Sequence, residues 1–266
     1  MPHRGKVVLF FPAFSSLEAT APLSLLALAT PLLDAGYDVR IIDSTITPDF
    51  QARVLHELRD AVALGVSLVT GPMIRQTVKL GRAAKAAFPD KPVILGGWHP
   101  SLLAGQTMET DFVDAVVRGQ GERVVVELLD RLQAGDDLEG LRGVSYKRDG
   151  EIHHNPPGEL VPLIELPPKA YHLADVDAYR QITGRRWLMY VSSLGCPYDC
   201  SYCTNAAVYQ RKWNALPADQ VVDEMANLVT THGLDLLWVV DDNFLVDTRR
   251  AVDIGEGANA PAVASG

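Results

Sequence analysis

The sequence has 266 residues, of which 47% are hydrophobic and 21% charged, as is typical of a globular protein of one or two domains. Its 33 acidic residues outnumber the 24 basic ones, and the net charge of -9 gives no general attraction to nucleic acid or anionic lipid. The apolar run from Val7 to Phe11 is too short for a signal-peptide core or a membrane span. We therefore expect a cytoplasmic protein that binds neither nucleic acid nor membrane.

The first part of the chain alternates short apolar runs with helical patterns, which predicts a parallel sheet wrapped by helices. The expected strands are Val7–Phe11, Val39–Asp43, Ala63–Leu68, Pro92–Leu95 and Phe112–Val117. The expected helices are Pro22–Asp34, Phe50–Ala61, Pro72–Phe88, a short turn after Pro100, and Glu122–Gln133. This order predicts an α/β fold, namely a flavodoxin-like, doubly wound, Rossmann-like domain over residues 1–140.

Small and hydroxylated residues follow the third, fourth and fifth expected strands. In a doubly wound sheet, ligands bind at the carboxyl ends of the strands, and glycines there let a large ligand approach the backbone. The candidate residues are Ser67, Thr70 and Gly71, then Gly96, Gly97, Trp98 and His99, and finally Gly119, Gln120, Gly121 and Glu122.

A hairpin and a proline-rich connector are expected over residues 141–184. Asp149-Gly150 is a typical two-residue hairpin turn within Gly143–His154. The prolines that follow disfavour regular helix or central strand and mark a domain boundary: Pro156, Pro157, Pro162, Pro167 and Pro168.

A second α/β domain is expected over residues 185–266. Its strand Trp187–Ser192 precedes a cysteine-rich loop, helix Pro217–Thr231 follows, and strand Leu236–Val240 ends at Asp241-Asp242-Asn243-Phe244. This pattern begins a parallel barrel or sheet. After a short helix at Thr248–Gly255, the small-residue tail predicts that the barrel is only partial, from a truncated or frameshifted gene.

The sequence contains three cysteines, and all lie within eight residues, in the run Gly195-Cys196-Pro-Tyr-Asp-Cys200-Ser-Tyr-Cys203. Such clustering does not suit long-range disulfides and instead favours a metal site. Soft thiolate ligands favour an iron–sulfur cluster or zinc. Three thiolates on one short loop can hold a cuboidal cluster and leave its fourth iron open to a substrate or cofactor.

The Cys-x3-Cys-x2-Cys run resembles the signature of the radical SAM superfamily, including the aromatic Tyr202 before the last cysteine. The resemblance implies a 4Fe-4S cluster on Cys196, Cys200 and Cys203 that binds S-adenosylmethionine and, with one electron, cleaves it to a 5′-deoxyadenosyl radical. It also implies that Tyr202 lies against the adenine and that Asp241 or Asp242 contacts the methionine amino group. The electron would come from a donor such as flavodoxin or ferredoxin.

Other interpretations of these residues stay open. The cysteines can form a zinc site completed by a histidine, or remain unligated core thiols, although the sequence has no second cysteine pair and the loop has no histidine. Tyr202 can serve packing alone, and the two aspartates can be a solvated strand end or a helix cap.

The first domain resembles the cobalamin-binding domain that precedes the barrel in one large branch of the radical SAM superfamily. The matching positions are Pro22-Leu23-Ser24-Leu25-Leu26, Ser67, Thr70-Gly71, Gly96-Gly97-Trp98-His99-Pro100 and Gly119-Gln120-Gly121-Glu122. Each match alone is weak, since a glycine pair is often a plain turn and His99 can cap a helix. Their order along one sheet edge, upstream of a cysteine loop, carries the resemblance.

One motif of many cobalamin enzymes is missing: no Asp precedes a His by two residues with a Gly three residues beyond. We therefore expect that no histidine from that motif ligates the cobalt.

These features together predict a cobalamin-dependent radical SAM enzyme that methylates, or remodels a ring of, a small-molecule biosynthetic intermediate. Two alternatives stay open. One is a radical SAM enzyme that binds no cobalamin, and the other is a non-catalytic cobalamin-binding module with a vestigial cluster loop.

Overall fold

The computed structural model describes residues 4–14 and 19–259. The end of the small-residue tail considered above, at residues 260–266, lies outside the described residues. The chain divides into two compact units, Met1–Val161 with Leu166–Ala174, and Pro162–Glu165 with Asp175–Gly266. Within the described ranges, every helix is too short or too polar to cross a membrane.

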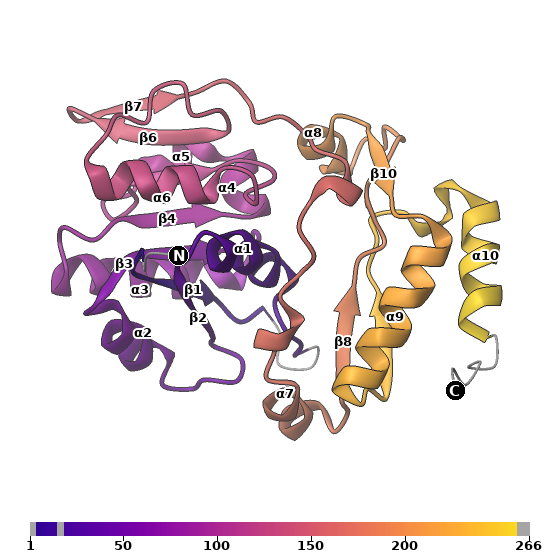
Figure 1. Cartoon of the computed structure of the whole chain (residues 1–266). Helices are drawn as coiled ribbons and strands as arrows, with labels where there is room; N and C mark the ends of the chain where they lie inside the picture. The colour runs from indigo at the N-terminus through magenta and orange to yellow at the C-terminus, as the bar shows by residue number, and fades with distance from the viewer. Residues whose placement is uncertain (1–3, 15–18, 260–266) are drawn as a thin grey trace. The chain divides into compact units, whose positions relative to one another are not determined.

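The first unit is built on a sheet that, among the described residues, has seven strands in the order β2-β1-β3-β4-β5-β6-β7 (Figure 1). The first five pair in parallel, and their order confirms the predicted flavodoxin-like topology. The bounds are β1 Lys6–Phe11, β2 Asp38–Asp43, β3 Ala61–Ser67, β4 Val93–Gly96, β5 Ala115–Val117, β6 Val144–Arg148 and β7 Glu151–His154.

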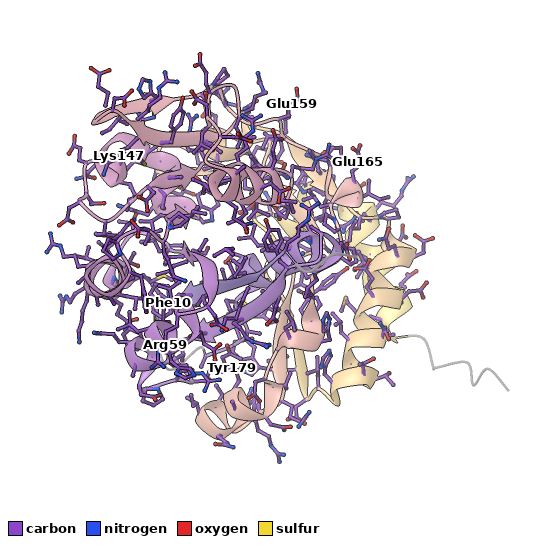
Figure 2. The ribbon with its side chains drawn as sticks, turned by 60° about the vertical axis from the view of Figure 1, so that its left-hand side comes forward. Phe10, Arg59, Lys147, Glu159, Glu165 and Tyr179 are labelled. Carbon is purple, nitrogen blue, oxygen red and sulfur yellow. The ribbon has the colours of Figure 1, made fainter. Side chains whose placement is uncertain are left out.

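Helices cover both faces of this sheet because side chains alternate along its buried strands. On β1, Val7 and Leu9 pack in one core with α1 (Leu23–Asp34) and α6 (Val125–Ala134). Val8 and Phe10 pack in the other core with α2 (Phe50–Leu58) and α3 (Pro72–Ala87). Phe10, labelled in Figure 2, stacks on Phe50 of α2 with the ring centroids 5.2 Å apart.

The predicted hairpin is present, and its two strands extend the sheet of the first unit. β6 pairs antiparallel with β5, and β7 with β6. Asp149 and Gly150 both have positive φ, at 53° and 81°, which a type I′ turn requires.

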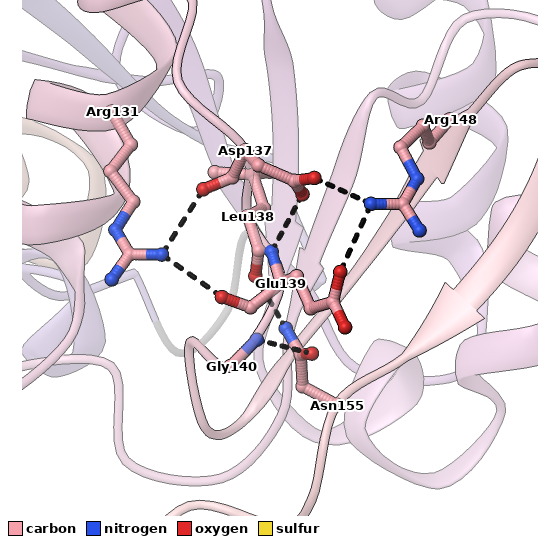
Figure 3. Close-up of polar contacts among 7 residues, drawn as sticks. All are labelled: Arg131, Asp137, Leu138, Glu139, Gly140, Arg148 and Asn155. Atoms are coloured by element: carbon pink, nitrogen blue, oxygen red, sulfur yellow. Dashed lines mark hydrogen bonds and ion pairs between the residues drawn. The ribbon is translucent and has the colours of Figure 1, made fainter.

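Polar contacts hold the hairpin to the loop that precedes it (Figure 3). Buried Asn155 donates from Nδ2 to the carbonyls of Leu138 and Leu141, at 2.7 and 3.0 Å, and its Oδ1 accepts from Gly140 N at 3.0 Å. Arg148 pairs with Asp137 and Glu139 on the same loop. The hairpin is therefore an integral edge of the first unit.

The proline-rich connector has short helical turns, η1 (Leu163–Glu165) and η2 (Tyr171–Leu173), and then α7 (Val176–Thr183). Two hydrogen bonds hold the connector to α1 of the first unit. Thr30 Oγ1 donates to Pro168 O at 2.6 Å, and Ala170 N donates to Leu26 O at 3.0 Å. The α7 helix was not expected. Its N-cap Asp175 accepts from Ala178 N at 2.9 Å, and it ends at left-handed Gly184.

The second unit contains a parallel β-α-β arrangement, as the sequence predicts for the start of a barrel. β8 (Trp187–Tyr190) pairs in parallel with β11 (Leu236–Val239), and α9 (Ala218–His232) connects them. Between β8 and α9 lie β9 (Ser193–Gly195), α8 (Asn205–Tyr209) and β10 (Trp213–Ala215), which together frame the cysteine loop. η3 (Phe244–Val246) and α10 (Thr248–Asn259) follow β11.

Several element boundaries differ from expectation. α2 ends at Leu58 because β3 begins as early as Ala61, and α6 begins at Val125, after a turn that contains Glu122. Two short helices, α4 (Trp98–Leu102) and α5 (Ala104–Met108), stand where a single turn was expected. α10 continues to Asn259 through Gly255 and Gly257, although glycine disfavours helix.

Candidate functional site

The structure brings the candidate residues that follow β3, β4 and β5 to one edge of the sheet. Ser67 lies opposite Gly96 in the parallel register of β3 and β4. A Cβ atom added to Gly96 would lie 3.7 Å from the carbonyl oxygen of Val117, the last residue of β5. The three strand ends therefore form a continuous edge, as the doubly wound topology predicts.

A glycine is required at position 97 because the backbone there lies very close to the backbone of Leu68. Its φ is +93°, and an added Cβ would lie 2.6 Å from the carbonyl oxygen of Leu68. The same carbonyl accepts a 3.3 Å hydrogen bond from His99 N. Gly97 thus allows the turn after β4 to close against the end of β3, and its role is to shape the edge.

His99 and Thr70 meet across this turn. The Thr70 Oγ1 and His99 Nδ1 atoms lie 3.0 Å apart, and the imidazole is half-buried at the start of α4. Burial lowers the pKa of His99, which favours the neutral ring near neutral pH.

The ends of β4 and β5 are joined by Ser101, a residue that the sequence did not single out. Its hydroxyl donates to Gly97 O at 2.7 Å and accepts from Gly119 N at 2.9 Å. Gly119 has a φ of +78°, and a Cβ there would meet no atom within 4 Å, so open space lies beside this backbone. A Cβ on Gly121 would instead lie 2.9 Å from Leu28 Cδ2 of α1, so that glycine serves close packing.

Gln120 and Glu122 differ in what surrounds them. The Gln120 side-chain amide makes two hydrogen bonds to one connector residue. It accepts from Val161 N at 2.7 Å and donates to Val161 O at 3.0 Å. Glu122 is half-buried in the turn before α6, and burial raises the pKa of its carboxyl, against the opposing influence of its own amide and of Lys169.

Two further polar side chains missed by the sequence analysis lie just beyond β1. Ala13 N donates to Ser44 Oγ at 2.6 Å and to Gln76 Oε1 at 3.0 Å, and Ser44 Oγ donates to Gln76 Oε1 at 2.8 Å. These residues lie 31 to 63 positions apart in the sequence, so no local pattern connects them.

In the second unit, the cysteine loop begins at a tight backbone crossing. β9 pairs antiparallel with β10, with Gly195 opposite Trp213. Gly195 has a φ of +81°, and a Cβ there would lie 2.0 Å from Lys212 O. Gln210 and Arg211, just before this crossing, both adopt positive φ, at 55° and 57°, which is costly for residues with side chains.

All three thiols are free, with Cys196 half-buried and Cys200 and Cys203 exposed. Cys203 N donates to Cys200 O at 3.0 Å, which forms a turn within the loop. Within residues 4–14 and 19–259, no three His, Cys, Asp or Glu side chains, these cysteines included, are gathered closely enough to hold a metal ion. The donor set nevertheless fits an iron–sulfur cluster, since three free thiols lie on one short loop. Tyr202 is 88% exposed.

Three consecutive residues that follow the end of β11, Asp241, Asp242 and Asn243, form a strand-end triplet that contacts the entry to the cysteine loop. Asp241 accepts from Ser192 N and Oγ and from Ser193 Oγ, at 2.6 to 2.7 Å. Asp242 accepts from Gly195 N at 2.7 Å, and Asn243 Nδ2 lies 3.7 Å from Cys196 Sγ as a donor. Both aspartates therefore have a structural role at the loop.

Arg250 of α10 is a further anchor that sequence reasoning missed. Its guanidinium is buried, and it donates to Leu216 O at 2.7 Å and to Ser192 O at 2.9 Å. Burial lowers the pKa of Arg250, while nearby Asp241 opposes that shift. An arginine in a helical stretch is usually solvated, so the sequence contained no signal for this role.

Residues 14–129 match the family model of the B12 binding domain. The chain is 29% identical to an uncharacterised methyltransferase of Pyrococcus horikoshii, over 94% of this chain and 56% of that protein. It is 27% identical to the anaerobic magnesium-protoporphyrin IX monomethyl ester cyclase of Synechocystis, over 85% of this chain and 46% of the cyclase. The chain thus spans about half the length of the curated relatives it matches.

The fold is that of the radical S-adenosylmethionine methyltransferase TsrM from Kitasatospora setae, solved with cobalamin and a [4Fe-4S] cluster. The TM-score is 0.75 at 20% identity, over 94% of this chain and 50% of that one. An N-terminal B12-binding domain and a three-cysteine loop on a β-α-β unit define one class of protein, the cobalamin-binding radical SAM proteins. This chain is similar to proteins of that class in its match to the B12 binding domain, in its sequence and in its fold, as its motifs predict.

Proposed function

We propose that this chain provides the cofactor-binding part of a cobalamin-dependent radical SAM enzyme, which methylates, or remodels a ring of, a small-molecule biosynthetic intermediate. The observation that carries the proposal is the presence, in one chain, of a B12-binding domain and a three-cysteine loop anchored at the end of a barrel-type strand. The names of two relatives, a methyltransferase and a ring cyclase, support the two reaction types.

In this proposal Cys196, Cys200 and Cys203 hold the 4Fe-4S cluster. Held by these residues, the cluster would supply electron transfer to the sulfonium of S-adenosylmethionine, and cobalamin would supply a methyl carrier. The chain's own contribution is to hold the three thiols on a loop whose base is fixed by Gly195 and the strand-end triplet.

Tyr202 is proposed to lie against the adenine of S-adenosylmethionine, and its 88% exposure leaves the ring available for such stacking. For the methionine amino group, Asp242 is the better candidate of the two aspartates. Both oxygens of Asp241 accept hydrogen bonds, whereas Asp242 uses one oxygen for Gly195 N.

Cobalamin is proposed to bind at the carboxyl edge of the first sheet. The residues assigned to this edge are Ser67, Thr70, Gly71, Gly96, Gly97, His99, Gly119, Gly121 and Glu122. The open space beside Gly119 supports direct contact there, whereas Gly97 and Gly121 act by letting the backbone and α1 pack closely. No histidine of the missing Asp-His motif would ligate the cobalt, and a spectrum of histidine-ligated cobalt would contradict this.

The test is anaerobic reconstitution of the chain with iron and sulfide, followed by an assay for 5′-deoxyadenosine with S-adenosylmethionine and a reductant. The proposal expects about four irons and four sulfides per chain, and 5′-deoxyadenosine in excess of a no-reductant control. Cys203→Ser should lose both. Ser201→Ala, a change in the same loop that removes no thiol, is the matched control and should keep both.

Two other outcomes favour the alternatives. A cluster without cleavage favours the non-catalytic module, and zinc at the loop defeats the cluster assignment. Hydroxocobalamin titration, with and without oxygen, tests the first unit, and no binding at micromolar concentration favours a radical SAM enzyme without cobalamin. Replacing the chemical reductant by reduced flavodoxin or ferredoxin tests the proposed protein donor.

A further inference from the structure

Asn243 is the member of the strand-end triplet whose side chain reaches a thiol. Its Nδ2 atom lies 3.7 Å from Cys196 Sγ, within hydrogen-bond range for sulfur, and the two residues are 47 positions apart in the sequence. Cys196 is the half-buried thiol of the three. A hydrogen bond to it is therefore less exposed to competition from water than one to Cys200 or Cys203 would be.

The orientation of the Asn243 amide is fixed by its second contact. Its Oδ1 accepts a 3.2 Å hydrogen bond from Leu245 N, at the start of η3. With the carbonyl side held by that backbone N–H, the amino side faces the sulfur. Asn243 is therefore a donor at Cys196, because rotating the amide by half a turn would set its amino group against the Leu245 N–H, a second donor.

The neighbouring contacts hold this geometry in place. Asp242 accepts from Gly195 N at 2.7 Å, one residue before Cys196, and the close approach of Gly195 to Lys212 O fixes the backbone on the other side. Each member of the strand-end triplet contacts a different residue at the entry to the cysteine loop. Together these contacts hold the Asn243 side chain next to Cys196.

A donor at a ligand sulfur acts on the electronic state of a bound cluster. Adding one electron increases the negative charge on the sulfurs, and a hydrogen bond stabilises that charge. We infer that Asn243 is a positioning residue that sets the reduction potential of the cluster through its hydrogen bond to Cys196. This inference rests on the proposed function, because it requires a cluster on the three cysteines.

Asn243→Asp and Asn243→Ser separate this role from a folding role. Each keeps a side-chain oxygen that can accept from Leu245 N, and each removes the amide donor. Asp adds a charge next to the sulfur, whereas Ser is neutral and too short to reach it. Asn227→Asp, an exposed change on α9, adds the same charge away from the loop and is the matched control.

The measurement is a redox titration of the reconstituted full chain, followed by electron paramagnetic resonance of the reduced cluster, with iron content measured in parallel. Both Asn243 variants should bind iron as the wild type does and show a midpoint potential shifted to more negative values, further for Asp than for Ser. Asn227→Asp should leave the potential unchanged.

The outcomes that overturn the inference are distinct from those that overturn the proposed function. Full iron content with an unchanged potential in both variants overturns the role of Asn243 and leaves the proposed function standing. Loss of iron in both variants with retained secondary structure overturns the tuning role in favour of assembly alone. Wild-type chain that assembles no cluster overturns the proposed function, and the inference with it.

Discussion

Tyr37, directly before β2, is buried next to polar partners on α6. Its hydroxyl donates to Asp130 Oδ1 at 2.7 Å and accepts from Gln133 Nε2 at 2.7 Å. Burial, followed by the hydrogen bond to Asp130, raises the pKa of Tyr37 to about 12. The folded state therefore binds this proton more tightly than the unfolded state, whose tyrosine has a pKa of about 10.

The contribution of this proton to stability is present below pH 10 and is lost as the pH rises from about 10 to about 12. We expect the free energy of unfolding to fall across that interval by about 1–3 kcal/mol more in the wild type than in Tyr37→Phe. Urea unfolding at several pH values measures the difference. Equal slopes for the two proteins would show that Tyr37 does not titrate in this way.

Gly195 tests the backbone crossing beneath the cysteine loop. Gly195→Ala would combine a left-handed backbone with a Cβ 2.0 Å from Lys212 O. Gly184→Ala is a matched control in the same unit, with a φ of +74° and no atom within 4 Å of the new Cβ. We expect Gly195→Ala to lower the free energy of unfolding by at least about 2 kcal/mol more than the control, and to reduce iron binding. If chemical denaturation showed equal losses of unfolding free energy in the two variants, the close approach of Gly195 to Lys212 O would not constrain the fold as we expect.

At the scale of elements, the hairpin β6–β7 depends on Asn155. This buried amide donates to two carbonyls and accepts from one N–H of the preceding loop (Figure 3). Asn155→Asp keeps the shape but places a carboxylate against two carbonyl oxygens. We expect a loss of about 2–4 kcal/mol from the free energy of unfolding of the first unit. Gln51→Glu, which adds the same charge on α2, should change it little, and a similar loss there would attribute the effect to charge alone.

Some elements were predictable because their signal is local. The alternation of Val7, Val8, Leu9 and Phe10 between two cores gave the strand, and Asp149-Gly150 gave the turn. β9 and β10 were missed because three-residue strands show too little alternation to detect. At the candidate sites, the cysteines and the strand-end glycines follow from motif and position. Ser101 and Arg250 could not be predicted in this way, because their most distant hydrogen-bond partners lie 18 and 58 residues away in the sequence.

At the scale of the whole molecule, the two units should respond separately to their proposed cofactors. Hydroxocobalamin should slow amide hydrogen exchange at residues 67–71, 96–101 and 119–122. At a concentration 100 times its Kd, it should raise the free energy of local opening there by up to about 2.7 kcal/mol. Cluster reconstitution should instead protect residues 192–204 and 241–250. Protection of the cysteine loop by cobalamin alone, with no change along the first sheet, would refute the assignment of the two sites.

The strand-end triplet has a consequence for biosynthesis. Cys196 leaves the ribosome 47 residues ahead of Asn243, and at about 5–20 residues per second that interval lasts about 2–10 s. During this time the nascent thiols lack the side chains that later hold their loop. Iron delivered before residue 243 emerges would meet an unanchored loop, so correct loading is expected after translation has passed this point.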